Sequence, residues 1–369
     1  MLRIGVTGAH GLIGWHVRCR LFVEPDIEIV AAGREDFSDP ERLDAFVSRC
    51  DAIVHLAGMN RGEEAAIEQV NPALALALVE AFERTGAAPH VVYSSSTHVD
   101  RDTVYGRSKR RAGELLGEWS DRAGGLFSNM LLPHVFGERG RPFYNSAVST
   151  FCYQLATGAC PSIDVDIDLN LLHAQQVADL ILDAIRHRRS GTSRPDGHII
   201  KVSEMLDRVN ILAADYLSGI IPDLSNPLDL RLFNTFRSYL FPGHYPMSLK
   251  LNTDARGSLF EAVKTHHGGQ AFLSTTHPGI TRGDHFHFSK VERFLVVQGE
   301  ATIRLRRMFD DRVIEFPVSG TDPVVVDMPT LHTHNITNTG KGELLTMFWA
   351  HEIFDPDRPD TYRELVASG

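Results

Sequence analysis

The first residues of the chain combine a short apolar strand, a glycine turn and an apolar helix. Residues 2–6 are predicted to form the strand and residues 12–23 the helix. Gly8, Gly11 and Gly14 follow the strand in a GxxGxxG pattern. In such a turn the first glycine permits a tight bend, the second lets the backbone approach a pyrophosphate, and the third lets the helix pack on the strand. The pyrophosphate binds free N–H groups at the helix N-terminus, so this start predicts a dinucleotide-binding domain.

The first half of the chain continues to alternate strands with helices. Apolar, β-branched runs predict strands at residues 27–32, 52–56 and 90–94. Helical periodicity predicts helices at residues 41–49 and 73–85. This alternation indicates right-handed crossovers and a doubly wound parallel sheet of the Rossmann type.

The pattern changes near residue 247, where strand-like segments separated by Gly, Pro, Asp and Asn turns begin to dominate. These segments are residues 258–263, 269–274, 293–297, 301–306, 313–318, 324–327 and 344–349. They are typical of an antiparallel sandwich or barrel. A length of 369 residues is also more than one ordinary core needs. We therefore expect an α/β domain over residues 1–245 and an all-β domain over residues 246–369.

Composition argues against several classes of protein. The net charge of −10 disfavours a nucleic-acid surface, which is normally basic. No apolar run approaches the roughly 20 residues that a membrane-spanning helix needs. The 4 cysteines are scattered and form no CxxC pair, so they are expected as thiols in a reducing compartment. We expect a cytoplasmic enzyme that binds neither nucleic acid nor membranes.

The end of the second strand decides between the two nicotinamide dinucleotides. An acidic residue there would select NAD by binding the ribose 2′-hydroxyl, whereas an arginine can pair with the 2′-phosphate of NADP. Arg34 stands at this place and favours NADP(H), although Glu35 and Asp36 follow directly. The residues expected to contact the cofactor are Gly8, His10, Gly11, Leu12, Ile13, Arg34, Leu56, Ala57, Gly58, Tyr105 and Lys109.

A possible reducing site follows the fourth predicted strand. A serine run ends at Ser96, and Tyr105 and Lys109 lie four residues apart on a predicted helix, which places them on one face. An ammonium group beside a phenol lowers a pKa that is otherwise about 10. Tyr105 could then protonate an alkoxide formed by hydride delivery, while a serine hydroxyl holds the carbonyl oxygen.

These features together resemble the extended short-chain dehydrogenase/reductase family. Further matches are residues 54–58, Asn71 and residues 133–137. The resemblance implies that Ser96, or alternatively Ser95, hydrogen-bonds the substrate oxygen and that Lys109 also holds the nicotinamide ribose. Members of the family usually carry Asn where this chain has His134.

The β-rich half contains a pattern of metal-ligating residues. His285 and His287 would share one face of a strand, Glu292 could return from the next strand, and His334 follows later, with His332 as its competitor. Three imidazoles and a carboxylate suit a divalent transition metal, with Zn²⁺ preferred. The HxHxxxxE pattern with a later His resembles the cupin metal motif. Four protein ligands favour a metal that stabilises the barrel, because catalytic zinc usually keeps one position open.

The same half also resembles the dTDP-sugar 3,5-epimerases, which are cupins. The matching residues are 254–261, 282–285 and 296–300. In those enzymes the histidine after the Arg-Gly turn is the base that removes a proton beside a ketone. His285 occupies that place but is also the first expected metal ligand, so the epimerase mechanism does not transfer intact.

Over its whole length the chain resembles the CapF-type bifunctional UDP-sugar enzymes. The match is carried by residues 54–61, 144–148, 150–153, 294–297 and 354–362. It implies a homodimer whose cupin epimerises C3 of a UDP-4-keto-6-deoxy-HexNAc and whose reductase reduces C4 with NADPH. The product would be UDP-2-acetamido-2,6-dideoxy-L-talose, on the way to UDP-L-FucNAc for capsule or O-antigen. Two alternatives remain: a reductase whose cupin serves as a dimerisation module, and a non-enzymatic sensor, which the presence of Tyr105 and Lys109 disfavours.

Overall fold

The structure, a computed structural model, describes residues 1–367. The chain divides into two compact units: residues 1–150 with 164–202, and residues 151–163 with the chain from residue 203 onward. Helices α8 (Val202–Leu217) and α9 (Pro227–Leu240) thereby belong largely to the β-rich unit. The expected boundary at residue 245 marks the point where the chain passes from these helices to strands.

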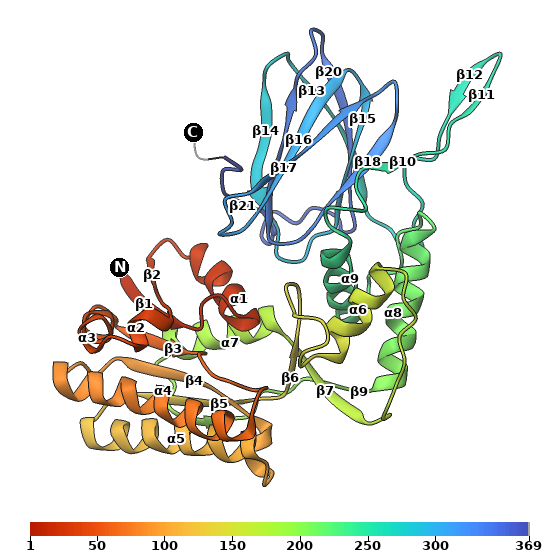
Figure 1. Ribbon diagram of the computed structural model, residues 1–369. Helices are drawn as coiled ribbons and strands as arrows, with labels where there is room; N and C mark the ends of the chain where they lie inside the picture. Colours follow the sequence, from red (N-terminus) through yellow and green to blue (C-terminus); the bar gives the residue numbers. More distant parts are fainter. Residues whose placement is uncertain (368–369) are drawn as a thin grey trace. The chain divides into compact units, whose positions relative to one another are not determined.

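The first unit contains the predicted doubly wound parallel sheet (Figure 1). Its strand order is β2-β1-β3-β4-β5-β8, and every neighbouring pair is parallel. The strands are β1 (Leu2–Thr7), β2 (Ile27–Ala32), β3 (Ala52–His55), β4 (His90–Ser96), β5 (Phe127–Leu132) and β8 (Gly191–Ser193). The edge strand β8 is exposed throughout and has no apolar residue, which is why periodicity did not predict it.

Helices cover both faces of this sheet and bury a separate core on each side. Helices α1 (Leu12–Phe22) and α7 (Ala174–Arg186) contribute to one core, and α3 (Pro40–Ser48), α4 (Glu64–Thr85) and α5 (Val104–Ala123) to the other. Helix α3 begins where the Asp39 carboxylate accepts a backbone N–H bond and Pro40 occupies the first turn.

Helix α4 is longer than predicted. The prediction began after Pro72, but the helix runs through this proline from Glu64. Proline removes one backbone hydrogen bond, and the burial of Ile67 and Asn71 before it offsets that loss. By length and composition α4 is the one helix in residues 1–367 that could cross a membrane, yet it packs beside α5 and buries Leu78 and Phe82 in the core.

The strand order places a binding crevice at a defined point. Strand β1 lies between β2 and β3, so the chain leaves β1 and β3 toward opposite sides of the sheet. In open α/β sheets, ligands bind beyond the carboxyl ends of the strands at such a switch point. The Thr7 hydroxyl joins the two strand ends by accepting N–H bonds from Leu56 and Ala57, both at 3.1 Å. Short elements of this unit are α2 (Arg34–Phe37), a 3-10 turn (Thr97–Asp100) and the sheet β6-β7-β9 (His134–Phe136, Asp168–His173, His198–Lys201).

The second unit contains two five-stranded sheets, as the turn-rich pattern predicted (Figure 1). One has the order β10 (Met247–Ser248), β18 (Val324–Met328), β15 (Glu292–Gln298), β20 (Leu344–Ala350) and β13 (Gln270–Thr276). The other has the order β17 (Val313–Ser319), β16 (Glu300–Arg307), β19 (His332–Asn338), β14 (Thr281–Phe286) and β21 (Tyr362–Arg363). All their pairs are antiparallel, and Phe294, Ile303 and Phe348 from the two sheets share one core. A separate hairpin, β11 (Asn252–Asp254) and β12 (Gly257–Leu259), covers only the start of the strand expected at 258–263.

A buried polar network fixes the helices of this unit to its first sheet. Arg293 donates to both carboxylate oxygens of Asp327, at 2.7 and 2.9 Å, and Tyr216 of α8 donates to the same carboxylate at 2.6 Å. Arg237 of α9 donates to the Met328 carbonyl at 3.2 Å. Losing one partner of a buried pair costs about 3–5 kcal/mol, so these contacts require α8 and α9 to stay with the strands.

Candidate active site and metal centre

A cavity of about 790 Å³ in the first unit gathers most of the residues expected to bind cofactor and substrate. From the expected set, Gly8, His10, Gly11, Leu12, Ile13, Leu56, Gly58, Ser96, Tyr105 and Lys109 line it. They come from the turn after β1, the segment after β3, the end of β4 and helix α5. Arg34 and Ala57 lie outside this lining; the N–H of Ala57 is bound to Thr7.

The glycine turn is shaped by its backbone. Gly8 has a φ of +67°, and a Cβ there would lie 2.8 Å from the Ala57 nitrogen. A Cβ on Gly14 would lie 2.3 Å from the Gly8 oxygen, so α1 can pack this closely only with glycine. Within the described residues, no side chain caps α1 at Gly11, and its first turn carries no acidic group. Free N–H groups there fit a dinucleotide pyrophosphate.

Three charged residues follow β2, and the side chain of one of them is held by a hydrogen bond and an ion pair within the protein. The Asp36 carboxylate accepts the Gly33 N–H at 2.7 Å and pairs with Arg42 at 3.4 Å. Arg34 is exposed at the first position of α2, and the Glu35 carboxylate lies against Gly33. This leaves Arg34 and Glu35 as the charged groups available to a ribose at the end of β2.

The serine, tyrosine and lysine of the predicted reducing site line one cavity. Burial raises the pKa of Tyr105 to about 12, and a hydrogen bond with Ser96 opposes this rise. Burial also lowers the pKa of Lys109 to about 7, and its Nζ lies 4.3 Å from the centre of the Tyr93 ring. The expected lowering of the Tyr105 pKa by Lys109 is therefore wrong for this structure, because desolvation outweighs any effect of the ammonium. Tyr105 stays protonated at neutral pH and can donate a proton.

His134 lines the same cavity, where the reductase family usually has Asn. Its Nε2 is buried and has no hydrogen-bond partner among residues 1–367. Burial and the neighbouring His98 lower the pKa of His134, so its imidazole is neutral at pH 7. His134 therefore places a neutral imidazole in the wall of this cavity.

Further lining residues were not predicted from the sequence: Met59, Asn60, Thr97, His98, Arg139, Arg141, Tyr144 and Asn145. The sequence Arg139-Gly140-Arg141 could have predicted part of this lining, because it places two cations beside a glycine after β6. Asn71 fastens the segment after β3, since its Oδ1 accepts the Met59 N–H and its Nδ2 donates to the Met59 carbonyl, both at 2.8 Å.

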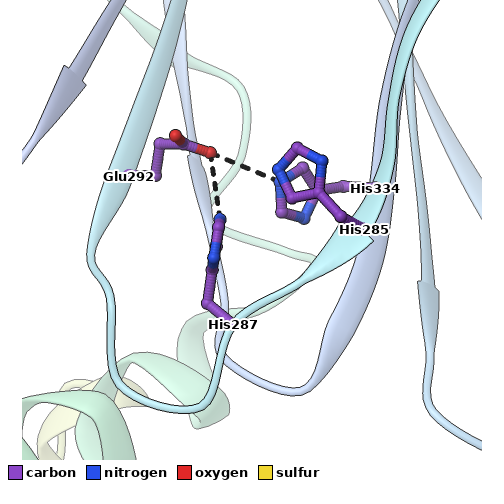
Figure 2. Close-up of side chains that lie close together, drawn as sticks. All are labelled: His285, His287, Glu292 and His334. Carbon is purple, nitrogen blue, oxygen red and sulfur yellow. Dashed lines mark hydrogen bonds and ion pairs between the residues drawn. The ribbon is translucent and has the colours of Figure 1, made fainter. Parts of the chain in front are cut away.

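The second unit brings the four predicted metal ligands together (Figure 2). His285 lies on β14 and His334 opposite it on β19, His287 follows β14, and Glu292 begins β15 of the other sheet. One potential ligand atom from each residue lies within 4.8 Å of the others. His332 is outside this group, and its Nδ1 bonds to the Thr330 carbonyl at 2.9 Å.

The hydrogen bonds behind the histidines indicate what the cluster can hold. Nδ1 of His287 bonds to the Asp360 carbonyl at 2.5 Å, and Nδ1 of His334 to the His332 carbonyl at 3.0 Å. A carbonyl only accepts, so each neutral ring carries its proton on Nδ1 and turns the Nε2 lone pair inward. Both Nε2 atoms lie 3.3 Å from Oε2 of Glu292 (Figure 2), and that of His334 forms no hydrogen bond within residues 1–367.

Three acceptors that face one another fit a cation. Two ligands about 2.0–2.1 Å from a tetrahedral zinc lie about 3.4 Å apart, close to these separations. Burial, His334 and His287 lower the pKa of His285 to about 3, which keeps its imidazole neutral as a metal ligand must be.

Comparisons with known proteins agree with both units. Residues 4–202 match the model of the NAD dependent epimerase/dehydratase family, and residues 252–362 match the polysaccharide biosynthesis C-terminal domain. RMD from Pseudomonas aeruginosa complexed with NADPH is 18% identical over 65% of this chain and 99% of its own, with a TM-score of 0.57. At this identity the likeness supports the fold alone.

Two relatives match the chain along its length. The UDP-2-acetamido-2,6-beta-L-arabino-hexul-4-ose reductase of Pseudomonas aeruginosa is 32% identical, with 100% of each chain covered. The capsular polysaccharide assembling protein CapF from Staphylococcus aureus is 33% identical over 98% of this chain and 100% of its own, with a TM-score of 0.64. The chain therefore belongs to the NAD dependent epimerase/dehydratase family and is a full-length homologue of CapF and of this UDP-sugar reductase.

Proposed function

We propose that this chain is a bifunctional enzyme that converts a UDP-4-keto-6-deoxy-HexNAc into UDP-2-acetamido-2,6-dideoxy-L-talose, toward UDP-L-FucNAc for capsule or O-antigen. The second unit, which we take to be a cupin barrel, epimerises C3, and the first unit reduces the C4 ketone. One observation carries the proposal: Ser96, Tyr105 and Lys109 line a single cavity with the glycine turn of a dinucleotide site. The full-length match to a 4-ketosugar reductase supports the substrate class.

In the reductase step, NADPH bound at the glycine turn would supply a hydride to C4 of the sugar. Ser96 holds the oxygen of the C4 ketone, and Tyr105 donates its phenolic proton to that oxygen as negative charge develops there. Lys109 binds the nicotinamide ribose. Arg34 pairs with a 2′-phosphate and makes NADP(H) the preferred cofactor. The ion pair between Asp36 and Arg42 supports this preference, because it holds one of the nearby carboxylates away from the ribose.

The epimerase step must come first, because the C4 ketone is what makes the C3 proton acidic and reduction removes it. A base in the second unit takes this proton to leave an enolate, and an acid returns a proton to the opposite face of C3. His285 is not that base in our proposal, since its ring belongs to the cluster of His287, Glu292 and His334. The group would hold Zn²⁺ and stabilise the unit, because four protein ligands leave no open position. A homodimer in the cytoplasm belongs to the same proposal.

The reductase claim is tested by mixing the full chain with the UDP-4-keto-6-deoxy-HexNAc and following the absorbance of NADPH. Consumption of one NADPH per sugar is the expected result, with NADH a poorer donor. An unchanged absorbance at high enzyme concentration would reject the reductase.

The second candidate function is a reductase whose β-rich unit only dimerises, and the place of His285 in the metal cluster favours it. Proton NMR in D₂O without NADPH separates the two. Exchange of the C3 proton with solvent supports the epimerase, and retention of that proton supports the reductase alone. Tyr105→Phe is the matched control, since it leaves the second unit unchanged and should exchange C3 like the wild type.

A further inference from the structure

The segment of residues 360–363 runs beside the cluster of candidate metal ligands in the second unit. Strand β21 (Tyr362–Arg363) pairs with β14, which carries His285. Asp360 lies two residues before β21 and contacts the turn between β14 and β15. This turn links two of the clustered residues, His287 and Glu292, so its conformation determines how they face each other.

The carboxylate of Asp360 fastens this turn through four hydrogen bonds. Its Oδ1 accepts the Phe288 N–H at 2.9 Å. Its Oδ2 accepts the Ser289 N–H and the Ser289 hydroxyl, both at 2.9 Å, and the Lys290 N–H at 2.8 Å. Hydrogen bonds to an ionised acceptor are about twice as strong as neutral ones, so a single side chain fixes three consecutive residues.

The backbone of the same residue orients one of the imidazoles. The Asp360 carbonyl accepts from Nδ1 of His287 at 2.5 Å, which leaves Nε2 directed at Glu292 Oε2, 3.3 Å away. Histidine ligands of metals commonly donate their second N–H to such an acceptor, which fixes the tautomer and the ring orientation.

A lysine of the turn in turn binds the segment that carries Asp360. Lys290 is buried, and its Nζ donates to the Pro359 carbonyl at 2.6 Å. The turn and the segment around Asp360 therefore hold each other through both side chains and backbone.

We propose that Asp360 is a positioning residue for the metal centre: its carboxylate holds turn 288–290, and its carbonyl fixes the ring of His287. This inference rests on the metal site of the proposed function. It extends that site to the C-terminal segment, which lies about 70 residues further along the chain than the turn it supports.

The test compares Asp360→Asn with the wild type as full chains. Asparagine keeps the size and the peptide carbonyl, and it tolerates the φ of +41° found at this residue. It offers one oxygen in place of two, so at least one backbone N–H of the turn meets an NH₂ group. Asp357→Asn is the matched control, because this exposed residue of the same segment undergoes the same change of charge.

Zn²⁺ affinity is measured by competition with a chromophoric chelator, and the site geometry by the visible absorption of bound Co²⁺. We expect Asp360→Asn to bind Zn²⁺ about 10- to 100-fold more weakly with an altered Co²⁺ spectrum, and Asp357→Asn to match the wild type. NADPH affinity should be unchanged in both variants. Ser289→Ala removes one of the four bonds without a change of charge and should give a smaller loss of Zn²⁺ affinity, which keeps the test valid if Asp360→Asn does not fold.

Wild-type Zn²⁺ affinity and an unchanged Co²⁺ spectrum in both Asp360→Asn and Ser289→Ala would overturn the role of Asp360 and leave the metal site intact. A wild-type chain that binds no Zn²⁺ would overturn the metal site itself, and the role of Asp360 with it.

Discussion

Replacing Tyr105 by phenylalanine removes the proposed proton donor and keeps the ring. With a pKa of about 12, the phenol is ionised in about one molecule in 100,000 at pH 7, so Tyr105 enters the reaction with its proton. A positioned general acid contributes about 10²–10⁴-fold, or about 3–5 kcal/mol of barrier. The lost hydrogen bond with Ser96 costs only about 1 kcal/mol of stability, so the variant should fold.

The assay is single-turnover oxidation of NADPH by the UDP-4-ketosugar, with NADPH affinity measured separately by fluorescence. We expect Tyr105→Phe to lose 10²–10⁴-fold in rate with little change in NADPH affinity. Tyr144→Phe is the control, because Tyr144 lines the same cavity and loses the same atom but is not the proposed acid. A near-normal rate in Tyr105→Phe, or an equal loss in Tyr144→Phe, would refute this assignment.

Three further predictions concern the cofactor, the metal and acid stability. Arg34→Ala removes a charge-assisted contact with the 2′-phosphate, which is worth about 1.5–3 kcal/mol. KM for NADPH should therefore rise about 10- to 100-fold, while KM for NADH stays nearly constant. Equal changes in the two KM values would contradict the role of Arg34. Chelation of Zn²⁺ should lower the free energy of unfolding of the second unit by about 4 kcal/mol, if the free metal had been a thousandfold above its dissociation constant. Calorimetry that shows no shift of the unfolding transition would count against a structural metal. Burial would raise the pKa of Glu138, but His173 and His16 lower it to about 2, below its ordinary 4.5. The ionised Glu138 carboxylate therefore stabilises the folded chain above pH 4.5, and this stabilisation is lost as the pH falls toward 2. In urea unfolding, Glu138→Gln should lower the free energy of unfolding by at most about 3 kcal/mol at pH 7 and by almost nothing near pH 2. An equal loss at both pH values would contradict this.

Apolar runs and turn residues in the sequence predicted most of the fold, because a buried strand needs apolar side chains and a tight turn needs glycine. The apolar runs of β1 to β4 and the glycine turn fixed the parallel sheet and its crevice. Strands β14 and β19 were harder to predict, since each carries polar residues where a buried strand normally has apolar ones. Their histidines nevertheless indicated the cluster of four candidate metal ligands, because the spacing of ligands is itself a local signal.

Features that depend on tertiary packing could not be predicted. The pKa of Tyr105 rises because the fold buries the phenol, and the i, i+4 spacing to Lys109 does not contain that information. The support of turn 288–290 by Asp360 joins residues far apart in the sequence. The buried Nε2 of His134 likewise became visible only when β6 was placed in the wall of the cavity.

In the proposed function, one chain epimerises C3 and then reduces C4 of a UDP-4-ketosugar. NMR of the product formed from UDP-4-keto-6-deoxy-HexNAc and NADPH in D₂O tests both steps in one sample. We predict a reduced sugar of L-talo configuration with solvent deuterium at C3 and the NADPH hydrogen at C4. A reduced sugar that keeps its original hydrogen and configuration at C3, or no reduced sugar at all, would contradict the account.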